Sequence, residues 1–365
     1  MTFGKRVLRR LVRFRHPTKL AQSRHDRAAV EGLPDGSEFD TLDQICHEQK
    51  GRSLQKAAHV HLSGWKSAGA YRLDLTLAGG QLWSIIYKNA IYDAEHIPAA
   101  EGFPVRPGPP EYTILCHASG TLAEVLPTIY LAEEITAGQH YRYLMEKINP
   151  AYQPLSYSSP ELLEIAGRLP TLHRAWTEWT DTAGLKNQVL DYGGTFSARL
   201  RDTVHTNLIR YMQSVDSATV RQTLDRWSDI LAVPSPDTVP VLVHGDFSPA
   251  NIYGAGGRIK ILDWEWAGMA PSMADLAALL KRASPEMEQE ALRRYSAGDP
   301  SHSFEEHNRL YEWSQLERGL LDVGYLAKQH LESPHSAASI PKYIDRSLQR
   351  ALLACERLNP GTGSR

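Results

Sequence analysis

The chain has 365 residues, with 40 lysine and arginine residues against 42 aspartate and glutamate residues and a formal net charge of −2. This length is sufficient for more than one compact region around a large core, and no apolar run is long enough to cross a bilayer. The three cysteines lack metal-binding spacing, which is typical of a reducing compartment and argues against a disulfide framework. We therefore expect a cytoplasmic protein.

The first 39 residues form a basic segment that differs in charge from the remaining chain. Eight basic residues precede the first acidic residue, namely Lys5, Arg6, Arg9, Arg10, Arg13, Arg15, Lys19 and Arg24. Removing them leaves 32 basic residues against 42 acidic ones, so the rest of the chain carries about −10. An acidic body favours a cationic small-molecule ligand and, without a recognition module, argues against nucleic-acid binding.

The basic segment also has a helical pattern. At about 100° per residue, residues 3–14 place apolar and basic side chains on opposite halves of a helix that Pro17 would end. Three roles stay open for this helix. It lies on an anionic membrane surface, it serves as a transit peptide, or it docks on the protein with no separate role.

Residues 40–148 predict an antiparallel sheet with one helix. Residues 41–44 have the pattern of a capping box that opens a short helix. Residues 71–77 alternate between apolar and polar side chains, as a half-buried strand does, and a glycine-containing turn leads into a strand over residues 82–88.

A second hairpin is predicted to join residues 128–135 to residues 140–148. Between the two hairpins, Pro109 and Pro110 indicate a helix start, because proline is tolerated in the first turn of a helix.

Residues 149–358 predict a mostly helical region, and residues 359–365 a disordered tail. Ser159, Pro160 and Glu161 suit the N-cap and the first two positions of a helix that runs through Leu169. Pro170 would break or kink this helix before residues 171–179. Further helical patterns recur over residues 196–212, 218–231, 286–295, 304–331 and 340–358.

Short strands interrupt this helical region near its middle. Residues 241–243 are apolar, and Pro249 should prevent a helix across the loop that follows them. Residues 252–253 and 259–262 are strand-like, and a glycine-rich turn joins them into a hairpin.

This hairpin should bring Asn251 back beside Asp263, with Asp246 at the mouth of the preceding loop. Their oxygen atoms suit a magnesium–triphosphate site and leave one carboxylate to accept a proton. His244, Asp246 and Asn251 also match the spacing H-x-D-x-x-x-x-N of kinase catalytic loops, with Asp263 at the position of the metal-binding aspartate.

These motifs, together with Glu265 two residues after Asp263, resemble the aminoglycoside phosphotransferase and choline kinase family. The resemblance implies an α+β, two-lobed, protein-kinase-like fold with an antiparallel-sheet N-lobe (residues 40–148) and a mostly helical C-lobe (residues 149–358). It further implies Asp246 as catalytic base, Asn251 and Asp263 as Mg²⁺ ligands, and His244 as the residue that orients the loop.

The segment after Asp263 lacks the long activation segment of protein kinases. It has instead Gly268, Pro271 and Asp275-Leu276-Ala277, which is similar to the same small-molecule family. We expect Asp275 to serve only as a favourable charge at a helix N-terminus. The resemblance implies that ATP or GTP phosphorylates a hydroxyl of an aminoglycoside, amino sugar, sugar or amino alcohol.

The same resemblance implies a nucleotide site. Lys88, at the end of the third strand, would reach the α- and β-phosphates, and Glu111 would pair with it, with Glu95 or Glu101 as alternatives. Other expected nucleotide contacts are Ser67 and Gly69, in the loop over residues 62–70, and Glu146 and Ile148, at the hinge between the lobes.

The late helices would build the acceptor pocket. Two interpretations are open for four of their residues, Tyr311, Trp313, Glu317 and Asp322. They contact a cationic acceptor through aromatic faces and charge, or they form a core stripe with an acidic face, and we favour the second interpretation. His173 and His205 are expected to be ordinary helix residues. The alternative function is a catalytically inactive kinase-like scaffold that binds a partner or a membrane through the basic segment.

Overall fold

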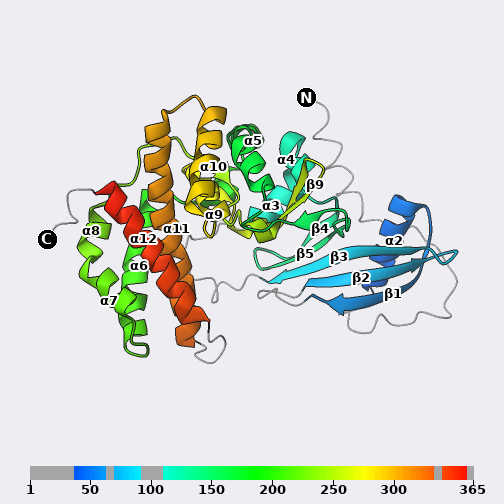
Figure 1. Cartoon of the computed structure of the whole chain (residues 1–365). Helices are drawn as coiled ribbons and strands as arrows, with labels where there is room; N and C mark the ends of the chain where they lie inside the picture. The colour runs from blue at the N-terminus through cyan, green and yellow to red at the C-terminus, as the bar shows by residue number, and fades with distance from the viewer. Residues whose placement is uncertain (1–36, 63–69, 92–109, 333–338, 360–365) are drawn as a thin grey trace. The chain divides into compact units, whose positions relative to one another are not determined.

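The computed structural model describes residues 37–62, 70–91, 110–332 and 339–359 (Figure 1). The described residues divide into two compact units, of which the first comprises residues 37–59 and 74–83 and the second comprises the remaining described residues. The predicted basic helix and most of the predicted tail lie outside the described residues. Among the helices of the described ranges, none combines the length and hydropathy needed to span a bilayer.

In the first unit, helix α2 (Ser37–Lys50) precedes strand β1 (Leu54–His61). Asp43 Oδ1 accepts a hydrogen bond from the backbone N–H of Leu54 at 2.6 Å, which ties the helix to the start of the strand. The predicted capping box at residues 41–44 is wrong, because α2 begins four residues earlier and Thr41 lies inside it. The pattern of a capping box also occurs within helices, so it does not fix a helix start by itself.

The first unit also contains the turn between β2 (Ala70–Leu77) and β3 (Leu82–Ile91). Gly79 and Gly80 have φ values of 84° and 77°, a region that glycine enters without steric cost. Arg52 donates a hydrogen bond to the carbonyl oxygen of Ala78 at 2.7 Å. The predicted strands and turn are confirmed here.

Strands β4 (Ile129–Thr136) and β5 (His140–Glu146) form the second predicted hairpin, and β3 pairs with β5 antiparallel. The five-stranded sheet has the order β1-β2-β3-β5-β4. Lys88 lies inside β3, opposite Tyr143 of β5, rather than at the strand's end. Helices α3 (Pro110–His117) and α4 (Gly120–Val125) follow β3, and α3 begins at the predicted proline.

The remaining chain is mostly helical, in agreement with the predicted α+β class. Its helices are α5 (Glu161–Ala183), α6 (Gly194–Met212), α7 (Ala218–Asp225), α8 (Trp227–Ala232), α9 (Met273–Leu279), α10 (Pro285–Gly298), α11 (Phe304–Glu332) and α12 (Ile340–Leu358). Figure 1 shows α11 in orange running alongside α12 in red and α6 in green, and the three share one apolar core.

Two expectations about helix continuity are corrected. Pro170 does not break helix α5, which continues through this buried proline. Packing of α5 against α10 and β8 outweighs the backbone hydrogen bond that proline cannot make. Conversely, the helix predicted over residues 218–231 is two helices, which are interrupted at Arg226.

Two small sheets position the polar residues of the predicted catalytic motif. One contains β6 (Gln153–Pro154), β9 (Ile252–Ala255) and β10 (Arg258–Ile261). The other contains β7 (Leu190–Asp191), β8 (Val241–Val243) and β11 (Gly268–Ala270). The hairpin β9–β10 confirms the predicted glycine-rich turn, where Gly256 and Gly257 have positive φ.

Candidate active site

The loop after β8 requires glycine at position 245. Gly245 has a φ of 79°, and a Cβ atom built there would lie 2.0 Å from the carbonyl oxygen of Trp266. This close approach packs the loop against η5 (Trp264–Trp266), the turn that follows Asp263. Pro249 starts a single 3-10 turn, η4 (Pro249–Asn251), and no α-helix crosses this loop, as we expected. Proline fits there because the first residue of a helix has no N–H partner to lose.

His244 connects the loop to the strand that leads to Asp263. Its Nδ1 accepts a hydrogen bond from the backbone N–H of Asp246 at 3.2 Å, so its Nε2 carries the proton that is donated to Leu262 O at 2.9 Å. The ring is fully buried and packs against Trp264, with 4.7 Å between ring centroids. Both nitrogens are therefore used for positioning the loop.

Asp275 fixes the same loop from helix α9. Its carboxylate is fully buried and accepts backbone hydrogen bonds from His244 at 2.8 Å and Gly245 at 2.9 Å. His173 Nε2 lies 3.1 Å from the same carboxylate. Asp275 does lie in the first turn of α9, but its contacts show a larger structural role than the helix charge that we expected. His205 stacks on Trp227 and lies in an ordinary helical position.

Asn251 lies between Asp246 and the strand before Asp263. Its backbone carbonyl accepts a hydrogen bond from Leu262 N at 2.9 Å, which places it next to Asp263 as the hairpin predicted. Its amide Nδ2 donates to Asp246 O at 3.0 Å and to Asp246 Oδ2 at 3.2 Å. The amide carbonyl of Asn251 is thereby left for a cation, and an amide oxygen with a carboxylate suits Mg²⁺.

Asp263 is the one non-glycine residue of the described ranges with positive φ, at 66°. Aspartate tolerates this left-handed conformation better than most residues, and such backbone geometry is concentrated at functional sites. Its Oδ1 lies 2.9 Å from Lys88 Nζ. The unusual backbone turn therefore directs this carboxylate toward the buried lysine.

Lys88 contacts three carboxylates at once. Its Nζ lies 2.7 Å from Glu111 Oε2 and 3.4 Å from Glu265 Oε1, in addition to Asp263. Burial raises the pKa of Glu111 to about 7, although Lys88 opposes this increase. The structure thus brings together Lys88, Glu111 and Asp263, as the resemblance implied, whereas Glu95 and Glu101 lie outside the described residues. Glu265 belongs to the recognised motif, but its contact with Lys88 was not predicted.

Arg318 of α11 is a site residue that the sequence analysis missed. It donates to Asp246 Oδ1 at 2.7 Å and to Gly245 O at 2.8 Å, and its Nε lies 3.1 Å from Asp322 Oδ1. Burial alone would raise the pKa of Asp246, but the positive charges of Arg318 and Lys281 lower it below its ordinary value. The expected base is therefore held as a carboxylate.

The four late-helix residues divide between core and site. Tyr311 and Trp313 are buried in the apolar clusters, as we favoured. Glu317 is also buried and pairs with Arg201 at 2.7 Å, linking α6 to α11. Asp322 instead contacts Arg318 and lies 3.7 Å from Lys281, beside Asp246.

The structure gives less information on the other four residues that we expected to contact the nucleotide. Ser67 and Gly69 lie outside the described residues. The backbone N–H of Glu146 already donates to Thr128 O at 2.8 Å, and its side chain contacts Thr128 and Lys260. Ile148 follows β5, and its backbone has no hydrogen bond to another residue within the described ranges. Ile148 is thus better suited than Glu146 to offer a backbone group to a purine.

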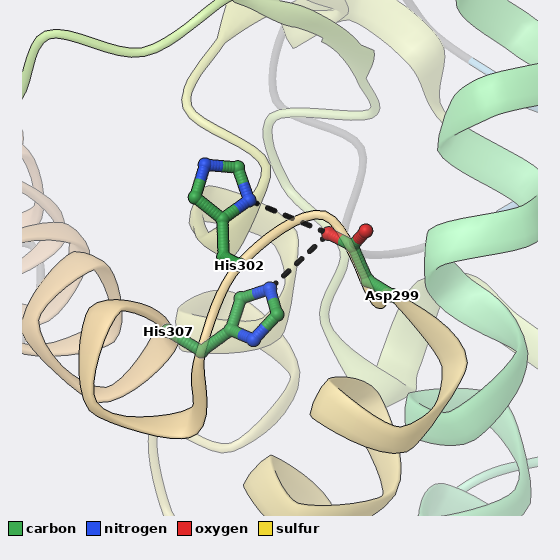
Figure 2. A group of neighbouring side chains, drawn as sticks. All are labelled: Asp299, His302 and His307. Carbon is green, nitrogen blue, oxygen red and sulfur yellow. Dashed lines mark hydrogen bonds and ion pairs between the residues drawn. The ribbon is translucent and has the colours of Figure 1, made fainter.

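A second polar cluster lies apart from the motif residues, in the connection between α10 and α11. Figure 2 shows His302 and His307 directed at the carboxylate of Asp299. His307 is buried, with Nε2 3.1 Å from Asp299 Oδ2 and Nδ1 2.9 Å from Ser296 Oγ. Asp299 Oδ1 accepts from Ser301 Oγ and N. The polar groups of the cluster are thus hydrogen-bonded to one another, and we interpret the cluster as a link between α10 and α11.

A model of the phosphotransferase enzyme family matches residues 135–344. This range covers more than half of the chain and contains the catalytic loop, Asn251, Asp263 and Arg318. The chain belongs to the phosphotransferase enzyme family, which confirms the resemblance seen in its motifs.

Solved structures show the same protein-kinase-like fold at low identity. A spectinomycin phosphotransferase in complex with ADP and spectinomycin is 15% identical, with a TM-score of 0.53 over 86% of this chain and 98% of that one. A choline kinase from Cryptosporidium parvum Iowa II is 9% identical, with a TM-score of 0.54 over 87% and 96%. These similarities confirm the predicted fold class.

Sequence similarity to a curated protein is confined to part of the chain. An N-acetylmuramate/N-acetylglucosamine kinase of Neisseria meningitidis serogroup B is 33% identical over 137 residues. The match spans 34% of this chain and 41% of that protein. The chain therefore spans about two fifths of the length of this relative.

Proposed function

We propose that the protein transfers the γ-phosphate of ATP to a hydroxyl group of a small molecule. The observation that carries this proposal is the continuous set of contacts from Glu111 through Lys88 to Asp263, and from Asn251 to Asp246. These contacts join the buried Lys88 of β3 to Asp263, which follows the β9–β10 hairpin, and Asn251 to Asp246 in the loop before the hairpin. Phosphoryl transfer needs this combination of positioned charge and a proton acceptor.

Each residue has one role in this proposal. Lys88, held by Glu111, binds the α- and β-phosphates, and His244 keeps the catalytic loop in place. Asn251 and Asp263 would hold Mg²⁺, which when bound neutralises charge on the phosphate oxygens. Asp246 accepts the proton of the acceptor hydroxyl as the new phosphate ester forms.

The acceptor that we favour is a sugar or an amino sugar. The support is the partial similarity to a kinase named for N-acetylmuramate and N-acetylglucosamine. ATP is favoured over GTP because ATP binding is typical of the family and a solved structure of the same fold contains ADP.

The proposal is tested by release of ADP or GDP from the full chain with Mg²⁺ and each nucleotide. The acceptors are N-acetylated hexosamines, simple sugars, aminoglycosides, choline and ethanolamine. Asp246→Asn is the blank, because it keeps the shape of the side chain but cannot accept the proton. We expect at least one sugar to be phosphorylated and the variant to be about 10² to 10⁴ times slower. Absence of transfer to every acceptor, with no stabilisation by magnesium nucleotide, would instead favour a scaffold.

A further inference from the structure

The two carboxylate oxygens of Asp246 face different neighbours, and this defines the side from which an acceptor arrives. Oδ2 is 3.2 Å from Asn251 Nδ2, on the side of the expected metal ligands. Oδ1 is 2.7 Å from Arg318, on the side of helix α11. If the proposed function holds, the phosphates occupy the first side, so the acceptor hydroxyl reaches Asp246 from the side of α11. The residues around Arg318 therefore determine which acceptors bind.

The charge on this side of Asp246 is positive. Arg318 of α11 contacts the carboxylates of Asp246 and Asp322, and Lys281, which lies between α9 and α10, is 3.7 Å from Asp322. The next residue, Arg282, belongs to the same group of charges, because Arg282, Arg318, Asp246 and Asp322 all act on the pKa of Tyr157. Three cations against two anions leave this cluster with a net charge of +1. Burial lowers the pKa of Lys281, and the neighbouring Arg318 lowers it further, although Asp322 acts in the opposite direction.

Arg282 is an exposed residue whose guanidinium lies against two aromatic rings. Its guanidinium carbon lies 5.6 Å from the ring centroid of Tyr157 and 5.2 Å from that of Tyr343. Tyr157 precedes α5, whereas Tyr343 is in the first turn of α12, so two distant segments converge on one arginine. Within the described ranges, its contacts are these two rings, and it has no hydrogen bond or carboxylate partner. Aromatic rings contact the face of a guanidinium and leave its N–H groups directed outward.

The geometry points to an acceptor that carries a carboxylate, which Arg282 binds through its N–H groups with Lys281 as the neighbouring charge. Arg282 is thus a specificity-determining residue of the proposed transfer. A guanidinium binds a carboxylate with two parallel hydrogen bonds, and a single carboxylate matches the single surplus positive charge of the cluster. This inference reverses the expectation of a cationic acceptor, because the local charge differs in sign from that of the body of the chain.

The test compares sugars that differ by a carboxylate, with the full chain, Mg²⁺ and ATP. One pair is N-acetylmuramate and N-acetylglucosamine, which differ by a lactyl ether, and the other is glucuronate and glucose. We expect kcat/KM to be roughly 10- to 100-fold higher for the acid in at least one pair, as for a hydrogen bond to a charged group. Arg282→Gln should lower this ratio toward one through the KM of the acid, and Arg282→Lys should restore part of it.

Two controls separate recognition from folding. Arg293→Gln, at an exposed position of α10, should leave the ratio unchanged. Tyr343→Leu, which removes one of the two rings, should lower the ratio less than Arg282→Gln does. The KM for ATP should stay the same in all four variants, which a general loss of structure would not allow.

The outcomes distinguish this inference from the proposed function. If kcat/KM for neutral sugars or cationic aminoglycosides equals or exceeds that for the acids, the inference is wrong and the kinase activity stands. The same conclusion follows if Arg282→Gln slows both members of each pair equally. If no acceptor is phosphorylated, the proposed function and this inference are both overturned.

Discussion

Asp275 Oδ2 lies 2.8 Å from the backbone nitrogen of His244, so a helix residue 31 positions away holds the start of the catalytic loop. The other carboxylate oxygen accepts from Gly245 N. A single buried side chain therefore satisfies two successive backbone donors, which would otherwise be buried without partners.

Asp275→Asn tests this relationship. An amide has only one accepting oxygen, so one of the two buried N–H groups loses its partner. We expect the free energy of unfolding to fall by about 2 to 3 kcal/mol, measured by urea denaturation. Asp225→Asn, at an exposed position of α7, should change it by less than about 0.5 kcal/mol. Equal effects of the two substitutions would show that the Asp275 contacts do not stabilise the loop.

Gly245→Ala should destabilise the protein by more than the cost of placing alanine at a positive φ. The added Cβ would meet the Trp266 carbonyl oxygen at 2.0 Å, and a backbone atom cannot move aside as a side chain does. Gly256→Ala is the matched control, because Gly256 also has positive φ but has no atom within 4 Å of the added Cβ. We expect Gly256→Ala to cost about 1 kcal/mol of stability and Gly245→Ala to cost about 3 kcal/mol or more. Similar melting temperatures of the two variants would contradict the close approach of Gly245 to Trp266.

Two aspartates of the proposed site should respond differently to magnesium nucleotide. Mg²⁺–ATP at about 100 times its Kd stabilises a protein by roughly 2.7 kcal/mol, which thermal denaturation detects. Asp263→Asn should remove most of this stabilisation, because it removes a negative ligand and a partner of Lys88. Asp246→Asn should keep it while losing phosphate transfer. The assigned roles are wrong if Asp246→Asn loses the stabilisation and Asp263→Asn keeps it.

Arg318→Met should reduce turnover without weakening nucleotide binding. The substitution removes the cation that contacts both Asp246 and Asp322, although Lys281 stays near Asp322, and it releases the carbonyl of Gly245. We expect kcat to fall by about 10- to 100-fold, as for a displaced catalytic group, with little change in the KM for ATP. Arg293→Met provides an exposed control. A normal kcat in Arg318→Met would show that Asp246 does not depend on this contact.

The elements with strong local signals could be predicted from the sequence. The β9–β10 hairpin follows from apolar strands around a glycine-rich turn, and the β2–β3 hairpin follows from period-two alternation. Because the hairpin fixes the backbone of Asn251 against Leu262, the proximity of Asn251 and Asp263 could also be inferred. The contact between Lys88 and Glu111 depended on family resemblance, since a sheet strand and a helix 23 residues apart carry no local pattern of pairing.

Contacts that depend on helix packing could not be predicted. Arg318 and Asp322 read as a polar face of a long helix, and only the packing of α11 brings them to Asp246. Asp275 likewise resembles any acidic residue in a first helical turn until the loop is placed against it. The predicted break at Pro170 is wrong for the same reason, because the burial of α5 outweighs the local preference of one residue.

The pH dependence of stability tests the polar link between α10 and α11. Burial alone would raise the pKa of Asp299, but hydrogen bonds from Ser301 and His307 hold it below its ordinary value of 3.8. The folded protein therefore binds this proton less tightly than the unfolded chain does. The resulting stabilisation is present above the unfolded pKa and is lost as the pH falls through the lower folded value.

Asp299→Asn should remove this stabilisation. At pH 6 we expect the variant to melt roughly 2 °C below the wild type, and this difference should shrink when both are measured near pH 3. Asp225→Asn controls for the loss of one negative charge at a position without these contacts. A difference in melting temperature that stays constant from pH 6 to pH 3 would mean that the Asp299 carboxylate gains nothing from Ser301 and His307. The link between the helices would then depend on the apolar contacts of α10 and α11 alone.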